Sequence, residues 1–112
     1  MKKDILAKRV GELLIRWGIT PELKGFQYII DAVCLWDRKK RITEIYYEIA
    51  DKRNDSWTAV ERSIRHAFSG LDFNRNEVKS YFGNIERKNQ KLISVIAWKI
   101  NESEIGGSKD GE

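Results

Sequence analysis

The sequence has few residues that could build a metal, redox or disulfide site, with one cysteine and one histidine among its 112 residues. One thiol cannot close an internal disulfide, and one cysteine with one histidine cannot supply the four ligands of a tetrahedral metal site. Cys34 is therefore expected to be a small buried helix residue in a reducing compartment. We expect no metal and no cofactor.

Long apolar runs and catalytic motifs are also missing. No stretch approaches the roughly 20 apolar residues of a membrane-spanning helix, and Lys8, Arg9 and Glu12 interrupt an N-terminal segment that a secretory signal would keep apolar. The glycines form no phosphate-binding loop, and neither a nucleophile with its base nor a carboxylate pair can be argued from the spacing. We expect a cytoplasmic protein with no membrane partner, no enzymatic activity and no small-molecule substrate.

The residues that are present suit one helical domain. Apolar residues recur at helical spacing, without a strand pattern or a repeat. We predict an all-α fold of about six helices around one core over residues 1–102, followed by a disordered tail at 103–112. The net charge of +4 favours a polyanionic partner only mildly. The predicted helices span residues 4–17, 20–36, 42–52, 56–70, 74–82 and 89–100.

Helix ends and one internal glycine add detail to this prediction. Thr20, which precedes Pro21, is expected to cap the second helix, and Asn74 and Asn89 are expected to cap the fifth and the sixth. Gly25 lies inside the second helix, where it weakens the helix unless a neighbouring element packs closely against it.

A tight junction separates the third and fourth predicted helices. Asn54 can adopt the left-handed conformation, and Asp55 or Ser56 can cap the helix that follows. Two helices joined by a tight turn are the outline of a helix-turn-helix, which we place at about residues 42–70.

The fourth helix carries the sequence VERSIRH, whose polar side offers Glu61, Arg62 and Arg65. On the second helix of a helix-turn-helix such a side can enter the major groove, where arginine donates to guanine and glutamate accepts from cytosine. A solvated face explains the same pattern equally well. Glu61 and Arg65 have the spacing of an exposed ion pair worth about 0.3 kcal/mol, and Glu61 could form a capping box with Thr58.

Other features also permit two interpretations. The cations of DRKKR, at residues 37–41, suit a solvated connector or an edge that contacts phosphate. His66 could contact a phosphate or bond to a backbone carbonyl at the edge of the core. The tryptophans lie on or beside apolar stripes, so we expect them in the core rather than as base-stacking platforms. They are Trp17, Trp36, Trp57 and Trp98.

Five segments together resemble a known family. They are GITPELKGFQYI (18–29), YYEIADKRN (46–54), VERSIRHAF (60–68), SYFG (80–83) and LISVIAWKI (92–100). In this order they resemble the C-terminal effector domain of stage-zero sporulation protein A, the master response regulator of endospore formation in Gram-positive bacteria. The resemblance implies an all-helical domain whose helix-turn-helix binds a promoter box in double-stranded DNA, often as tandem copies; we expect tandem binding or a homodimer here.

The resemblance also implies candidate site residues. It places Glu61, Arg62 and Arg65 on the recognition helix in contact with DNA bases. Ala59 stands where the family usually has an arginine, so one contact is expected to be missing and the preferred DNA sequence to differ. The family regulator carries an N-terminal receiver domain, and we expect this chain to be a free-standing relative. We predict contacts with the DNA backbone from Lys39, Lys40, Arg41, Lys52, Arg53, Ser56, Thr58 and His66.

These observations lead to one main hypothesis and two rivals. The main hypothesis is a sequence-specific DNA-binding transcriptional regulator that uses residues 56–70 as its recognition helix. The first rival is a protein-interaction module that pairs with a family regulator without reading promoter sequence. The second is a basic RNA-binding helical domain.

Overall fold

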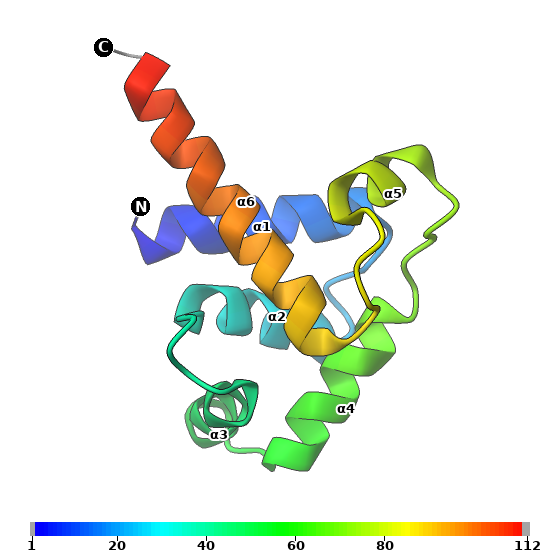
Figure 1. Cartoon of the computed structure of the whole chain (residues 1–112). Coiled ribbons are helices and arrows are strands. Elements are labelled where there is room, and N and C mark those ends of the chain that lie inside the picture. Colours follow the sequence, from blue (N-terminus) through cyan, green and yellow to red (C-terminus); the bar gives the residue numbers. More distant parts are fainter. Residues whose placement is uncertain (1, 111–112) are drawn as a thin grey trace.

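A computed structural model describes the backbone of residues 2–110 and the side chains of residues 2–101. This part of the chain folds into six helices and contains no strand (Figure 1), which confirms the predicted all-α fold. The helices are α1 (Lys3–Arg16), α2 (Lys24–Leu35), α3 (Ile42–Arg53), α4 (Trp57–Phe68), α5 (Asn76–Phe82) and α6 (Asn89–Asp110). None of those helices has the length and apolar character needed to cross a membrane.

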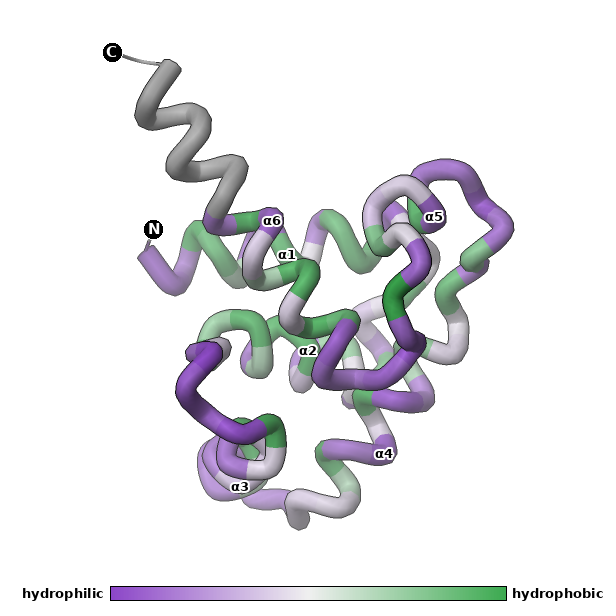
Figure 2. Tube along the Cα trace, in the orientation of Figure 1, coloured by the Kyte–Doolittle hydropathy of each residue, from purple (hydrophilic) through white to green (hydrophobic). Residues whose placement is uncertain are grey.

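Helix α2 lies at the centre of the fold and packs against α1, α3, α4 and α6. Because it has neighbours on several sides, most of its residues are buried. All six helices contribute apolar side chains to one core. Figure 2 shows that hydrophobic segments gather where α1, α2 and α6 meet, whereas the connector between α2 and α3 is hydrophilic.

Gly25 allows α2 to approach α4 very closely. A β-carbon added to Gly25 would lie 2.2 Å from the carbonyl oxygen of Ser63 and 2.6 Å from the β-carbon of Ala67. No side chain fits at these distances without a shift of one helix. The sequence predicted that a neighbouring element packs closely against Gly25, and that element is α4.

Two predicted helix starts are wrong. Helix α2 begins at Lys24 because residues 20–23 form a separate turn, in which the Thr20 carbonyl accepts a hydrogen bond from the amide of Leu23. Helix α5 begins at Asn76 because the carboxylate of Asp72 accepts a hydrogen bond from the amide of Asn74 and holds it in a turn. The local turn chemistry outcompetes the caps expected at Thr20 and Asn74.

The tryptophans do not all lie in the core. Trp17 is buried and Trp36 is half-buried, but Trp57 is 39% exposed and Trp98 is 61% exposed. Trp57 is the first residue of α4, where its ring packs against that of Tyr47, and Trp98 lies on α6 opposite the buried side of that helix. The core prediction is thus wrong for these last two.

Two further predictions concern Cys34 and the tail. Cys34 is half-buried on α2, less enclosed than expected, and burial raises the pKa of its thiol. Among the side chains described, no group of three or more His, Cys, Asp or Glu residues could hold a metal ion. Helix α6 continues to Asp110, past the predicted helix end at residue 100 and through most of the tail at 103–112 that we predicted to be disordered. The disorder of the tail and the domain boundary at 102 stay predictions.

Candidate nucleic-acid interface

Helices α3 and α4 form the predicted helix-turn-helix. Asn54 ends α3 in the left-handed conformation, with φ of 56° and ψ of 52°. Ser56 then caps α4, because its hydroxyl accepts a hydrogen bond from the amide of Ala59 at 3.1 Å. Both features confirm the junction predicted from the sequence. Figure 1 shows α3 nearly end-on while α4 runs across the view, so the two helices are steeply inclined to each other.

Helix α2 is hydrogen-bonded to the turn between α3 and α4. The hydroxyl of Tyr28 donates a hydrogen bond of 2.6 Å to the Asp55 carboxylate, whose other oxygen accepts from the amide of Ser56 at 2.8 Å. Burial and the bond to Asp55 together raise the pKa of Tyr28 to about 12, and the same bond lowers the pKa of Asp55. The turn that places the start of α4 is therefore anchored to the centre of the fold.

Two further hydrogen bonds between α2 and the helix-turn-helix come from Arg53. Its Nε and Nη2 atoms each donate a hydrogen bond of 2.8 Å to the carboxylate of Asp31, which is only 4% exposed. Burial raises the pKa of Asp31, but the hydrogen bonds from Arg53 and Gln27 outweigh that effect and the pKa lies below its ordinary value. Arg53, which we predicted to contact the DNA backbone, is thus engaged within the protein.

Asp31→Asn is expected to lower the free energy of unfolding at pH 7 by about 1 to 3 kcal/mol, because Arg53 loses its charged partner. The lowered pKa means that Asp31 stabilises the fold above about pH 4, the range of a free carboxyl, and that this stabilisation is lost as the pH falls further. Urea unfolding of both proteins at several pH values should therefore show curves that converge in acid. Asp51→Asn is the control, since Asp51 is exposed on α3; equal stability of Asp31→Asn and wild type at pH 7 would contradict the assignment.

One side of α4 is buried and the opposite side faces outward. Val60, Ile64, Ala67 and Phe68 point into the core. Arg62 lies at the middle of the outward side and, within the described side chains, forms no ion pair. The exposed residues of this outward side are Thr58, Arg62, Arg65, His66 and Ser69. The structure thus brings Arg62, Arg65 and His66 together on one surface.

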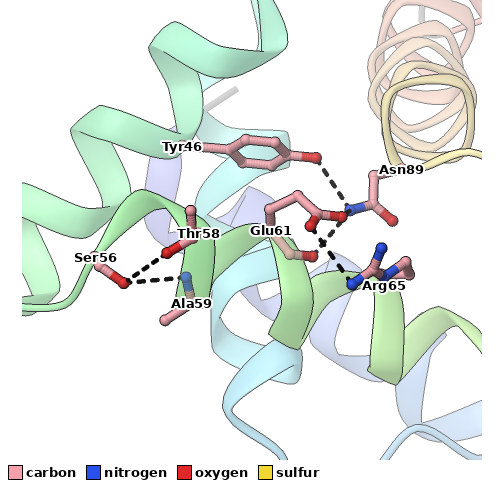
Figure 3. A network of polar contacts seen from close by, with 7 residues as sticks. All are labelled: Tyr46, Ser56, Thr58, Ala59, Glu61, Arg65 and Asn89. Atoms are coloured by element: carbon pink, nitrogen blue, oxygen red, sulfur yellow. Dashed lines mark hydrogen bonds and ion pairs between the residues drawn. The ribbon is translucent and has the colours of Figure 1, made fainter.

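Glu61 lies at the edge of this surface, next to the start of α6 (Figure 3). Its Oε1 atom is 3.7 Å from Nη2 of Arg65, so the exposed ion pair anticipated from the spacing is present. The capping box with Thr58 is not formed, because Ser56 is the cap. Asn89 does not cap α6 with its side chain as predicted. Its amide Nδ2 instead donates to the Tyr46 hydroxyl at 3.0 Å and to the Glu61 carbonyl at 3.1 Å.

The residues predicted to contact the DNA backbone are spread over three locations. The connector at 37–41 forms a turn that is closed by hydrogen bonds to Asp37. Lys39 is exposed on this turn, while Lys40 donates a hydrogen bond of 2.8 Å to the carboxylate of Glu48. Arg41 is exposed just before α3, and Lys52 is exposed near its end. At the start of α4 the hydroxyls of Ser56 and Thr58 lie 3.2 Å apart, and His66 is exposed near its end.

Two cations beside α4 were not identified from the sequence. Lys24, the first residue of α2, lines a hollow together with Arg62 and His66. Arg87, in the connector before α6, lines another hollow together with Arg65. Both are distant from VERSIRH along the chain, so no local pattern could have associated them with it.

An all-helical domain with a helix-turn-helix and cations on the outward side of its second helix belongs to the class of DNA-binding domains. The comparison with protein families agrees. The family model for the C terminal of sporulation initiation factor Spo0A matches residues 10–100. The chain belongs to this family of DNA-binding effector domains, which serves transcription regulation in sporulation and is not a family of enzymes. No solved structure matches the chain.

Proposed function

We propose that the protein is a sequence-specific transcriptional regulator that inserts α4 into the major groove of double-stranded DNA. The observation that carries the proposal is the position of Arg62, which is exposed at the middle of the outward side of α4 and forms no ion pair among the described residues. Such a guanidinium has all its donors available for a ligand. Guanine offers two acceptors in the major groove that match this geometry.

Arg65 and Glu61 are proposed to read bases as a pair. Their ion pair is long, at 3.7 Å, and Arg65 is 65% exposed, so the guanidinium can still reach a guanine edge or a phosphate. The Glu61 carboxylate can accept from the amino group of cytosine or orient Arg65. Asn89 restricts Glu61, because its Nδ2 lies 3.1 Å from the Glu61 carbonyl and 3.5 Å from Oε2.

The DNA backbone is proposed to bind around the outward side of α4. Ser56 and Thr58 lie at the start of α4, where side-chain hydroxyls and free backbone amides suit a phosphate. Four exposed side chains can approach a phosphate without giving up a partner, whereas Lys40 and Arg53 would first have to leave their carboxylates. The exposed group consists of Lys39, Arg41, Lys52 and His66. Binding as a homodimer or as tandem copies on adjacent half-sites is part of the proposal.

Selection from a pool of random duplexes, followed by sequencing of the bound fraction, tests this function. The proposal expects an enriched motif of a few adjacent base pairs. Retention that is abolished by salt and enriches no motif would contradict it and favour a module that pairs with a family regulator. Tighter binding to single-stranded or folded RNA than to the same sequence as duplex DNA would favour the RNA-binding interpretation.

A further inference from the structure

Two hollows flank α4 and each contains a cation from a different element. One, of about 230 Å³, lies between α4 and the start of α6 and includes Arg65 and Arg87. The other, of about 340 Å³, lies between α4 and the start of α2 and includes Arg62 and Lys24. Each hollow therefore adjoins one arginine of the outward side of α4. The outward side of α4 is therefore bordered by positive charge on both sides.

Arg87 stacks on the ring of Phe73. Its guanidinium carbon lies 4.1 Å from the centroid of the Phe73 ring, which is a cation–π contact. Stacking uses the face of the guanidinium and leaves the N–H groups at its edge for acceptors. The neighbouring Glu86 is paired with Lys88 at 3.3 Å. In the described part of the chain no carboxylate forms an ion pair with Arg87, so its charge is available to an external anion.

Lys24 is placed by the close approach of α2 and α4. The adjacent Gly25 lies against the backbone of Ser63, which brings the start of α2 onto the side of α4. Lys24 is exposed and forms no ion pair among the side chains described, although its charge contributes to the lowered pKa of Asp55. A lysine here presents a compact charge on a flexible stem, which suits a phosphate rather than a base edge.

We infer that Arg87 and Lys24 bind phosphates of the two DNA strands that border the groove occupied by α4. The major groove is about 12 Å wide and has one sugar–phosphate backbone along each side. A helix within it that reads bases through Arg62 and Arg65 has one strand beside each hollow. The inference rests on the proposed function for the orientation of α4, and it adds two contacts that carry no sequence information themselves.

The salt dependence of binding tests these two contacts. Each phosphate contact that is lost should reduce the slope of log K against log salt concentration by about 0.9. We expect this reduction for Arg87→Ala and for Lys24→Ala, about twice as much for the double variant, and the same values on a selected duplex and on a permuted one. Arg87→Lys should keep most of the slope. Lys88→Ala is the matched control, because it removes the same charge from the next residue, which is paired with Glu86.

An unchanged slope in both Arg87→Ala and Lys24→Ala, with helical content and unfolding temperature as in wild type, would overturn the inference. An equal reduction in Lys88→Ala would also overturn it, since net charge would then explain the effect. Failure of the proposed function is recognised separately. If wild type binds the selected and permuted duplexes equally but Arg87→Ala and Lys24→Ala still lose slope, the phosphate contacts stand and base reading does not.

Discussion

Replacing Gly25 with alanine is expected to lower the free energy of unfolding by about 2 kcal/mol, from overpacking that outweighs the gain in helix propensity. The new β-carbon would lie 2.2 Å from the carbonyl oxygen of Ser63, which belongs to the backbone and cannot rotate away. The helices α2 and α4 must therefore separate. For a domain of this size the change should lower the unfolding temperature by roughly 10 °C.

Gly11→Ala is the control for this experiment. Gly11 also lies inside a helix, but its added β-carbon would meet Phe26 and Ile30 at 3.5 Å, an ordinary van der Waals distance. Alanine at Gly11 should therefore leave the stability equal or increase it. Thermal and urea unfolding of the two variants measure the difference. Equal stability of Gly25→Ala and Gly11→Ala would show that α2 and α4 do not pack as described.

Replacing Arg62 with alanine is expected to weaken binding to the selected duplex by about 1 to 3 kcal/mol, which is roughly 5- to 150-fold. The loss should be concentrated at one base pair, where the variant should accept other bases nearly as well as guanine. Arg62 is exposed and supports no part of the core. The unfolding temperature of the variant should therefore equal that of wild type.

The control for Arg62 is Lys79→Ala, which removes an exposed cation from α5, far from the helix-turn-helix in Figure 1. It should reduce affinity slightly and equally for all sequences. Gel shifts with the selected duplex and with its single-base variants measure both effects. Equal binding of the selected duplex by wild type and Arg62→Ala would end the assignment of Arg62 to a base.

The features that sequence patterns predicted correctly are local ones. The apolar spacing located six helices, and Asn54 and Ser56 located the turn of the helix-turn-helix, because each depends on residues within a few positions of one another. Gly25 was interpretable for a different reason. A glycine inside a long apolar stripe is unfavourable unless a neighbour requires it, and that neighbour is α4.

The features that sequence patterns missed depend on contacts between distant residues or on competing turns. Asn89 has the residue type of a cap, yet its amide bonds to the backbone of Glu61, 28 residues away. Arg53 belongs to a basic stretch, but Asp31, 22 residues away, holds its guanidinium. Trp98 lies beside an apolar stripe in the sequence, yet it is on the exposed side of α6. No periodicity contains such long-range information.

One comparison of affinities tests directly whether the outward side of α4 reads DNA sequence. Wild-type protein would be titrated, at a fixed salt concentration of about 150 mM, with the selected duplex and with a duplex of the same composition in permuted order. If α4 reads sequence, the selected duplex should bind about 10³-fold more tightly, as is typical of specific recognition. Equal affinities for the two duplexes would contradict sequence reading by α4.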